Sequence, residues 1–326
     1  MAATTALPTF PERGTDLDVV ALGEPLAELS AESDGALEGA VGFALGYGGD
    51  TSNMAVAASR SGASTAYLTR VGDDAFGTLL MDMWKREGID TTGVIREPGG
   101  ETGLYFITRD AEEGHRFTYR RARSAASRLT PGDVTRTSVT RARLLHVSGI
   151  TQAVSSSACD TAFHAMRIAR EAGTLVSFDP NYRPALWPLE RARATILRSA
   201  ELSDVFLPNL GEGRLISGEE QPEAVADFFA RRGPAVVALK MGEDGVLLSE
   251  GGRLTHLPAH PVRALDATGA GDTFDGAFAA RLLAGDSVQD AARYAVVAAA
   301  LTTTGHGAVG PIPLRSAVEQ ARSTAV

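Results

Sequence analysis

Residues 265–274 read LDATGAGDTF, and the small and apolar residues that follow continue to about Leu283. We expect a helix to begin within this segment, after a strand-like stretch. Gly269, Ala270 and Gly271 carry almost no side chain, so backbone N–H groups at the start of the helix can approach an anion closely. The positive end of the helix dipole adds to the attraction. The segment therefore predicts an anion-binding turn at a helix start.

Asp272 stands in the first turn of the same predicted helix. A carboxylate at that position lies beside the anion and can accept the proton of an attacking hydroxyl group. The alternative is that Asp272 only caps the helix, because aspartate is a favoured N-terminal residue of helices. This segment by itself leaves both interpretations open.

Composition limits the class of protein. The chain has 326 residues, 44% of them hydrophobic, which is enough to bury a large core in one or two domains. A net charge of −9 disfavours nucleic acid and anionic lipid as partners. Residues 1–16 lack the features of a signal peptide, and no run approaches the ~20 apolar residues of a membrane span. The single cysteine, Cys159, fits a reducing compartment. We expect a cytoplasmic protein without nucleic-acid or membrane partners, and a disordered extension over residues 1–16.

Strand-like and helix-like segments alternate along most of the chain. Apolar strand-like runs occupy residues 17–23, 64–71, 143–148, 174–179, 205–208 and 235–240. Helical patterns occupy residues 53–61, 77–87, 157–171, 190–200 and 222–232. The alternation predicts an α/β fold in which helices cover both faces of a mostly parallel sheet. Ligands of such sheets bind beyond the carboxyl ends of the strands.

The alternation is interrupted between residues 103 and 121. Two strand-like runs, at residues 103–109 and 115–121, flank a polar connection at residues 110–114, a pattern typical of a β-hairpin. We expect this hairpin to form part of a small antiparallel sheet that projects from the main body.

Two motifs resemble those of the ribokinase-like (PfkB) carbohydrate kinases. They are GGDTSN at residues 48–53, followed by Gly62 and Gly72, and DATGAGD at residues 266–272. The resemblance spans residues 17–313 and implies one kinase domain over residues 17–326, a Rossmann-like α/β body with a small β-sheet lid formed by about residues 24–48 and 92–128. It also implies that a sugar binds between body and lid, that ATP binds on the body and that Mg²⁺ bridges its phosphates. Lids of this family often pair, which implies a homodimer or higher homo-oligomer.

The resemblance assigns Asp272 as the catalytic base and Gly269, Ala270 and Gly271 as the anion hole. The sequence NLGE at residues 209–212 resembles the family's Asn-x-x-Glu element, which places Asn209 near the phosphates and lets Glu212 act on Mg²⁺ through water. Two further glycine turns are similar to those that line the nucleotide, KMGEDG at residues 240–245 and GHGA at residues 305–308. They add the nucleotide-binding candidates Lys240, Gly242, Gly245 and Gly307.

The second motif departs from the family at Ala267. Asp266 and Thr268 occupy positions that help some relatives to bind a monovalent cation. Because the residue between them differs, we do not predict activation by potassium.

Four stretches resemble the 2-keto-3-deoxygluconate kinases within this family. They are GGDTSN at residues 48–53, GLY at 103–105, YRR at 119–121 with SAAS at 124–127, and DPNYRPALW at 179–187. The resemblance places the substrate against Gly48, Gly49, Asp50, Asn53, Tyr105, Tyr119, Arg121, Arg183 and Asp272. Guanidinium groups bind carboxylates through charge-assisted hydrogen bonds, so Arg121 and Arg183 are the candidates for the acid group of the sugar. Arg120 and Arg123 are expected to be solvated.

The implied reaction is transfer of the γ-phosphoryl group of ATP to the terminal hydroxyl of 2-keto-3-deoxygluconate. A neutral sugar is expected to leave Arg121 and Arg183 without an anion to pair with. The alternatives are another substrate (5-dehydro-2-deoxygluconate, fructose, ribose or a nucleoside) or a non-catalytic sugar-acid sensor on the same fold. A dinucleotide-dependent oxidoreductase is disfavoured, since no Gly-x-Gly-x-x-Gly follows the first strand.

Overall fold

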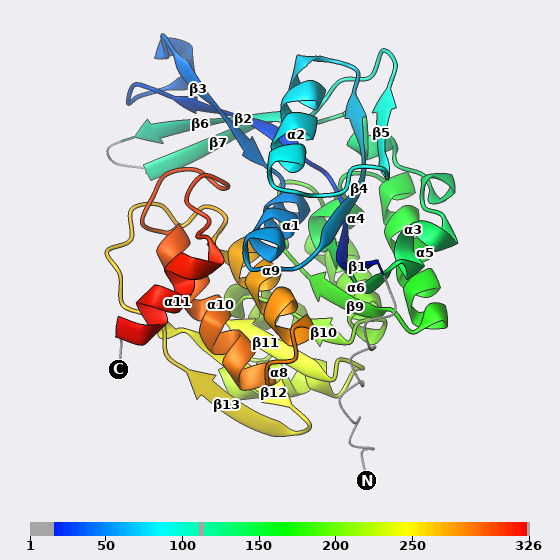
Figure 1. The fold of residues 1–326 in the computed structure, drawn as a ribbon, viewed down its shortest axis with the longest axis vertical. Helices are drawn as coiled ribbons and strands as arrows, with labels where there is room; N and C mark the ends of the chain where they lie inside the picture. Colours follow the sequence, from blue (N-terminus) through cyan, green and yellow to red (C-terminus); the bar gives the residue numbers. More distant parts are fainter. Residues whose placement is uncertain (1–15, 111–113, 325–326) are drawn as a thin grey trace.

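The computed structural model describes residues 16–110 and 114–324 and separates them into a large α/β body and a smaller sheet (Figure 1). The body contains a nine-stranded sheet in the order β13-β12-β11-β10-β9-β8-β1-β4-β5. Its parallel strands are β1 (Leu17–Leu22), β4 (Thr65–Gly72), β5 (Val94–Glu97), β8 (Ala142–Ser148), β9 (Leu175–Asp179), β10 (Val205–Phe206) and β11 (Val236–Lys240). Two antiparallel strands, β12 (Val246–Glu250) and β13 (Arg253–Leu257), extend it at one edge.

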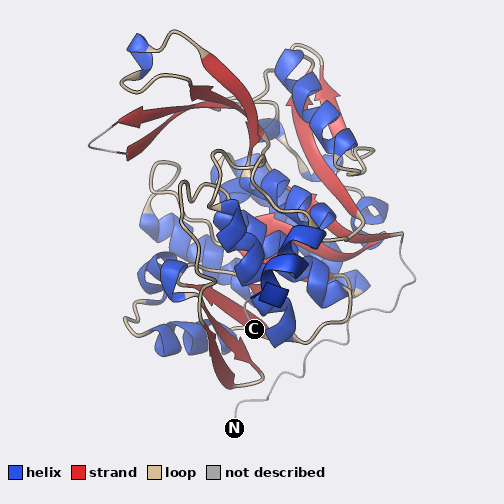
Figure 2. Ribbon diagram, turned by 60° about the vertical axis from the view of Figure 1, so that its left-hand side comes forward, coloured by secondary structure: helices blue, strands red, loops and turns tan. Residues whose placement is uncertain are grey.

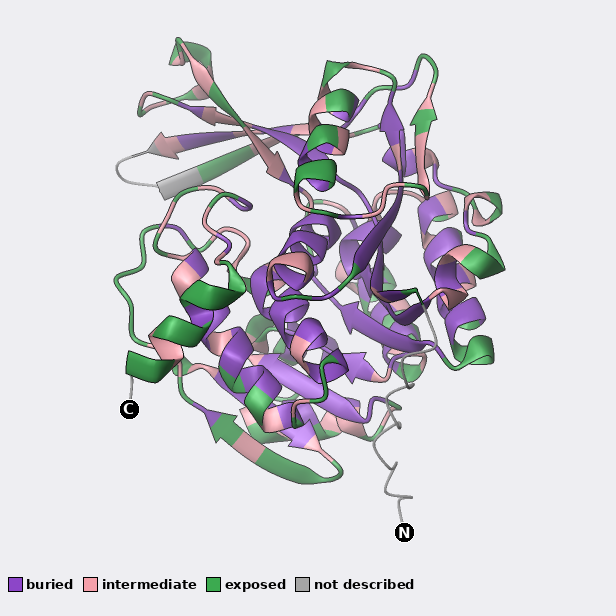
Figure 3. Cartoon of the chain, viewed as in Figure 1, coloured by how far each residue is buried: buried purple, intermediate pink, exposed green. Residues whose placement is uncertain are grey.

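Both faces of the central strands are buried, as Figure 3 shows. In β1, Val20 and Leu22 pack into the core on one face, and Val19 and Ala21 pack into the core on the other. Because successive side chains of a strand point to opposite faces, such a strand is apolar along most of its length. This explains why the parallel strands could be predicted from continuous apolar runs.

Two helical layers cover the sheet. One contains α3 (Arg136–Thr140), α4 (Gly149–Ala153), α5 (Ser156–Ala172), α6 (Leu189–Glu201), α7 (Leu210–Ser217) and α8 (Pro222–Ala230). The other contains α1 (Asp50–Arg60), α2 (Ala75–Arg86), α9 (Ala270–Leu283), α10 (Val288–Thr302) and α11 (Arg315–Thr324). In the part of the chain that the structure describes, no helix is both long enough and apolar enough to cross a membrane.

The predicted α/β body is confirmed, with one error near its most informative segment. The strand-like stretch expected before residue 265 is not a strand, because the chain from residue 258 to the start of α9 forms loops and turns. Pro258 and Pro261 lie in this stretch and lack the N–H that a sheet ladder needs. The predicted anion turn is therefore reached by a loop that crosses from the antiparallel edge.

The small sheet is the lid, and it stands apart from the body in Figure 2. It contains β2 (Leu26–Ala31), β3 (Phe43–Gly48), β6 (Leu104–Asp110) and β7 (Gly114–Arg120) in the order β3-β2-β6-β7. The two outer pairs of strands, β3–β2 and β6–β7, are antiparallel. The central pair, β2 and β6, is parallel, so the expectation of a wholly antiparallel sheet is wrong at this pair. The chain passes through the body between β3 and β6, so the two hairpins meet only at this parallel pair.

Two predicted segments need comment. Residues 92–97 were assigned to the lid, but β5 pairs with β4 and belongs to the main sheet, so the lid begins further along the chain. The predicted disordered extension, apart from Asp16, lies outside the described residues, as do residues 111–113 of the predicted hairpin connection.

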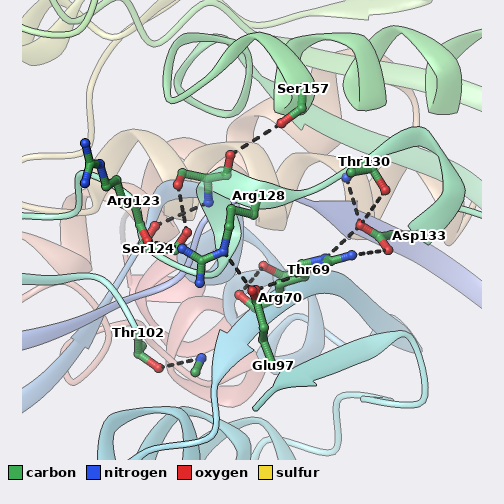
Figure 4. Close-up of polar contacts among 12 residues, drawn as sticks. Thr69, Arg70, Glu97, Thr102, Arg123, Ser124, Arg128, Thr130, Asp133 and Ser157 are labelled. Carbon is green, nitrogen blue, oxygen red and sulfur yellow. Dashed lines mark hydrogen bonds and ion pairs between the residues drawn. The ribbon is translucent and has the colours of Figure 1, made fainter. Parts of the chain in front are cut away.

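An ionic cluster fixes the chain that connects the lid to the body (Figure 4). Arg70 of β4 donates two hydrogen bonds to Asp133, at 2.8 and 2.7 Å, and Arg128 Nε donates to Glu97 Oε1 at 2.8 Å. Arg70 Nη1 also lies 3.6 Å from Glu97 Oε2. Bidentate arginine–carboxylate pairs are the most specific geometry for such contacts. The segment that leaves β7 is thereby held on the edge of the main sheet.

Candidate active site

A cavity of about 800 Å³ lies between the lid and the carboxyl ends of the parallel strands. Its position agrees with the rule for open α/β sheets. Most of the predicted site residues line it, from the starts of α1, α7 and α9, from the ends of β9 and β11, and from the lid strands β6 and β7. They are Gly49, Asp50, Asn53, Tyr105, Tyr119, Arg121, Arg183, Asn209, Glu212, Lys240, Gly242, Gly269, Gly271 and Asp272.

Four predicted residues are not among those that line the cavity, Gly48, Gly245, Ala270 and Gly307. A Cβ at Gly48 would lie 2.4 Å from the hydroxyl oxygen of Tyr105, so this glycine leaves room for the tyrosine. A Cβ at Gly245 would lie 2.1 Å from the carbonyl oxygen of Leu257, which gives Gly245 a structural role between β11 and β12. The N–H of Gly307 donates to Asp266 Oδ2 at 3.0 Å.

The predicted anion turn is the start of α9. Gly269 is the N-terminal cap, with φ 76°, and a Cβ there would lie 2.7 Å from the carbonyl oxygen of Ala308. Both constraints require glycine. The N–H of Ala270 donates to the carbonyl of Ala267 at 3.2 Å, so this amide closes the turn. Gly269 and Gly271 line the cavity on either side of it.

Asp272 lies in the first turn of α9 and lines the cavity. Its Oδ2 accepts a hydrogen bond of 2.8 Å from the side-chain amide of Asn53, at the start of α1. Burial, together with the nearby Asp50 carboxylate, raises the pKa of Asp272 to about 7. A carboxylate with that pKa is a stronger base than an exposed aspartate and is ionised in about half of the molecules at pH 7. The N-terminal cap of this helix is Gly269, so Asp272 is not the N-cap residue that the alternative interpretation made it.

Lys240 forms the centre of a buried ionic cluster. Its Nζ lies 2.9 Å from Asp179 Oδ2 and 2.9 Å from Asp275 Oδ1. Burial disfavours the charge on Lys240, but these two carboxylates outweigh it and raise the pKa of the ammonium group. Burial also raises the pKa of Asp275, one turn after Asp272 on α9. A Cβ at Gly271 would lie 3.6 Å from Lys240 Nζ, so the ammonium group is close to the anion turn.

The lid supplies an aromatic wall. Tyr105 and Tyr119 are directly opposite each other on β6 and β7, and their rings stack at 5.8 Å. Phe117 precedes Tyr119 by two positions on β7, and both line the cavity. This spacing, which places two side chains on one face of a strand, could have identified Phe117 from the sequence.

Two residues at the start of α1 that line the same cavity carry buried acceptors. Asp50 Oδ1 and Asn53 Oδ1 have no hydrogen-bond partner among the described residues, although both residues are nearly fully buried. Buried polar atoms are normally paired. Their other atoms are engaged, since Asn181 Nδ2 donates to Asp50 Oδ2 at 3.0 Å. The arrangement is suited to accept hydrogen bonds from the hydroxyl groups of a ligand.

The two predicted carboxylate-binding arginines already have acidic partners. Arg121 pairs with buried Glu24, and Arg183 Nη1 lies 3.6 Å from Glu212 Oε1. The expectation that a neutral sugar would leave both arginines without an anion is therefore wrong. Arg121 Nε is nevertheless a buried donor without a partner among the described residues. Arg120 and Arg123 are exposed, as predicted.

Sequence analysis missed several contributors to the site. Asp179 and Asn181 line the cavity after β9, and Glu24 holds Arg121 and accepts from Ser124 Oγ at 3.0 Å. Burial raises the pKa of Glu24 despite Arg121. Asp179 and Asn181 stand in a stretch that carries the family resemblance, but the sequence gives no sign of the pairing between Glu24 and Arg121, 97 positions apart.

Few side chains are available to hold a metal ion directly. Among the described residues, no group of three or more His, Cys, Asp or Glu side chains is arranged to do so. Glu212 lines the cavity next to Asn209, and burial, together with the Asp179 charge, raises the pKa of Glu212 to about 7. Mg²⁺ commonly keeps several waters and takes only one or two carboxylates in addition to the phosphates of a substrate. The residues present fit an ion of that kind.

The α/β body, the lid and a carboxylate beside a helix-start anion turn define a carbohydrate kinase. A family model described as pfkB family carbohydrate kinase matches residues 16–315. The chain belongs to this family.

Individual relatives of this chain are named as sugar kinases. The chain is 36% identical over 302 residues to the 2-dehydro-3-deoxygluconokinase of Bacillus subtilis (strain 168), covering 92% of this chain and 93% of that protein. It is 33% identical over 313 residues to Fructokinase-1 of Zea mays, covering 93% and 96%. A solved structure of a putative Ribokinase II in complex with ATP and Mg+2 from E. coli has a TM-score of 0.87 at 26% identity, covering 94% and 99%.

Proposed function

We propose that this kinase transfers the γ-phosphoryl group of ATP to the terminal hydroxyl of a sugar acid, 2-keto-3-deoxygluconate (2-dehydro-3-deoxygluconate). In this reaction, the hydroxyl oxygen forms a bond to the γ-phosphorus, and the bond between that phosphorus and the β–γ bridging oxygen breaks. The proton of the hydroxyl passes to Asp272, and ADP leaves. The N–H groups of Gly269 and Gly271 stabilise the charge on the transferring group.

The observation that carries the sugar-acid proposal is the unpaired Nε of Arg121. This buried donor belongs to a residue that lines the cavity together with Tyr105 and Tyr119. Its Nη2 donates to Glu24, which fixes the guanidinium group and leaves Nε without a partner among the described residues. Arg183 is half exposed and 3.6 Å from its partner, which leaves it free to turn toward an incoming carboxylate. Similarity to the Bacillus subtilis 2-dehydro-3-deoxygluconokinase supports the same substrate.

The nucleotide is proposed to bind beside Asn209, Lys240, Gly242 and the loop at residues 305–308. The E. coli structure in complex with ATP and Mg+2 supports ATP as the phosphoryl donor. The cavity is lined by five carboxylates, Asp50, Asp179, Glu212, Asp266 and Asp272, and by only three basic residues, Arg121, Arg183 and Lys240. Such a site repels a bare nucleotide tetra-anion, so we expect ATP to enter as its magnesium complex. Mg²⁺, when bound, neutralises charge on the phosphate oxygens, and Glu212 is the residue proposed to hold it through water.

A panel assay tests the substrate. The purified protein is given Mg-ATP and 2-dehydro-3-deoxygluconate, 5-dehydro-2-deoxygluconate, D-fructose, D-ribose or adenosine, and ADP release is measured. The proposal predicts that kcat/KM is highest for 2-dehydro-3-deoxygluconate by about tenfold or more, the size of a 1.4 kcal/mol difference in transition-state binding. It also predicts that Arg183→Gln lowers kcat/KM for the sugar acids more than for fructose.

Fructose is the second candidate, and two observations favour it. Glu24 neutralises Arg121 within the protein, and the Zea mays relative is a fructokinase at 33% identity. A higher kcat/KM for fructose than for either sugar acid would replace the sugar-acid assignment while keeping the kinase reaction.

Two further predictions remain proposals. We expect the enzyme to work in the cytoplasm, where ATP is supplied. We also expect a homo-oligomer formed through the lid, because Val41 and Leu45 are 95% and 60% exposed beside and on edge strand β3. Light scattering coupled to size-exclusion chromatography measures the mass of the particle, and a monomer would reject the second proposal.

A further inference from the structure

Glu28 is a buried carboxylate of the lid that lies outside the predicted site. It stands on β2, directly opposite Tyr105 on the parallel neighbour β6, and is 5% exposed. It does not line the cavity. A buried carboxylate needs hydrogen-bond donors, since an unpaired one is costly. The groups that contact the Glu28 carboxylate come from two different parts of the molecule.

The first donor is in the lid. The hydroxyl of Tyr105, which lines the cavity, donates to Glu28 Oε2. This contact fixes the position of the tyrosine hydroxyl relative to β2. Gly48 also leaves room for that hydroxyl, because a Cβ there would lie 2.4 Å from it. The tyrosine that faces the proposed sugar is therefore held on two sides.

The second contact is in the body. A Cβ at Gly307 would lie 3.2 Å from Glu28 Oε1, so the carboxylate lies against the loop at residues 305–308. Burial raises the pKa of Glu28, and the nearby backbone N–H of Ala308 opposes this rise. Glu28 thus bridges the lid and the loop at residues 305–308, which the sequence motif assigns to the nucleotide side. Ala308 itself lines the cavity.

The contacts continue from this loop to the anion turn. Gly307 N–H donates to Asp266 Oδ2 at 3.0 Å, and Asp266 Oδ1 accepts from the N–H and the hydroxyl of Thr268, at 2.9 and 2.6 Å. Thr268 directly precedes Gly269, where a Cβ would lie 2.7 Å from the Ala308 carbonyl oxygen. Close contacts therefore run from Tyr105 through Glu28 and the loop at residues 305–308 to the anion turn.

We propose that Glu28 is a positioning residue that couples binding of the sugar to binding of the nucleotide, by joining Tyr105 in the lid to the loop at residues 305–308 in the body. The inference rests on the proposed function, in which the sugar contacts Tyr105 and the nucleotide lies against that loop. A sugar that engages Tyr105 stabilises the closed contact between Glu28 and Ala308, and the loop is then ordered before the nucleotide arrives. By thermodynamic linkage the nucleotide has to favour sugar binding by the same factor.

Calorimetric titration measures this coupling without turnover. Mg-ADP is titrated into the wild-type enzyme with and without a saturating amount of the sugar substrate. That substrate is 2-dehydro-3-deoxygluconate or D-fructose, whichever the panel assay identifies. We expect the sugar to lower the Kd of Mg-ADP by about 5- to 150-fold, the usual range of coupling between two sites. In Glu28→Ala the factor falls to near one, whereas Glu28→Gln, which keeps an acceptor oxygen, retains most of it.

Glu32→Ala is the matched control, because Glu32 is an exposed carboxylate of the same lid. It should keep the wild-type coupling factor. Equal coupling in the wild type and in Glu28→Ala, or no coupling in the wild type, overturns the inference, while turnover in the panel assay still supports the proposed function.

Hydrogen exchange on the wild-type enzyme supplies a test that does not depend on the stability of a variant. With sugar but no nucleotide, the amides of residues 305–310 should exchange more slowly than in the free enzyme. Unchanged exchange in this loop also overturns the inference.

Discussion

At the scale of single residues, the site depends on how its carboxylates share a few donors. Asp272 has Asn53 as its amide donor, whereas Asp179 and Asp275 share Lys240. Burial opposes the ionisation of Asp179, but Lys240 outweighs it and lowers the pKa of Asp179. Burial and the Asp50 carboxylate raise the pKa of Asp272, and the hydrogen bond from Asn53 and the charge on Lys240 lower it only in part.

The pH dependence of the reaction follows from this arrangement. A general base acts when it is deprotonated, and burial, with the Asp50 charge, raises the pKa of Asp272 to about 7. We therefore expect kcat/KM to fall tenfold per pH unit below an apparent pKa near 7, since kcat/KM reports the free enzyme. The measurement is a profile from pH 5 to 9 at saturating Mg²⁺.

Asn53→Ala distinguishes Asp272 from other groups that titrate. Asn53 stabilises the charged form of Asp272 by a hydrogen bond of 2.8 Å, so its removal should move the acid limb to higher pH. An acid limb that stays in place in this variant would argue against Asp272 as the group that titrates.

Residue types in motifs could be predicted from the sequence, but their partners could not. The small residues around Asp272 show that the backbone can approach an anion. This inference uses only residues that are adjacent in the sequence. The pairs Arg121–Glu24 and Lys240–Asp275 join residues 97 and 35 positions apart. Such pairs depend on the tertiary structure. The sequence therefore could not show that Arg121 and Arg183 already have acidic partners in the folded protein.

At the scale of elements, the packing of α1 against α9 sets the distance between Asn53 and Asp272. Both residues lie in the first turns of these helices. The helices approach closely at Gly276, where a Cβ would lie 2.3 Å from the Met54 carbonyl oxygen and 2.7 Å from Ala57 Cβ. Glycine is required there by the neighbouring helix, although it costs some helix stability.

Gly276→Ala should therefore weaken both the fold and the site. The added methyl forces the two helices apart, and overpacking of this kind typically costs about 1–3 kcal/mol. Urea unfolding should show a lower midpoint, and kcat should fall because the contact between Asn53 and Asp272 lengthens. Gly132→Ala is the control, since a Cβ there meets only Thr130 Oγ1, at 3.8 Å. Equal midpoints for the two variants would contradict this account of the packing.

The predictability of the elements follows from their burial. The parallel strands β8 and β9 are buried at every position and mostly apolar, so they could be recognised, whereas β13 is mostly exposed and carries no such signal. The short strand β3 has two exposed positions and includes three small residues, Ala44, Gly46 and Gly48, so it was assigned only to the lid region as a whole. Half-buried strands near an edge have weak patterns because only one face is constrained.

At the scale of the whole molecule, the site exists only where the lid meets the body. The aromatic wall comes from β6 and β7, whereas the anion turn and Asp272 come from α9 (Figure 1). The ionic cluster around Arg70 fixes the lid connection to the edge of the main sheet. We expect closure of the lid over the substrates to exclude water, which otherwise competes with the sugar hydroxyl for the phosphoryl group.

The central claim is that Asp272 is the base that activates the sugar hydroxyl, and the most direct measurement is single-turnover phosphoryl transfer by Asp272→Asn. The amide keeps the shape of the side chain but cannot accept the proton at neutral pH. We expect the rate to fall by about 10²–10⁴-fold, the usual contribution of a general base, with the Kd values of Mg-ATP and the sugar within a few-fold of the wild type. A variant that still transfers the phosphoryl group within tenfold of the wild-type rate would contradict the claim.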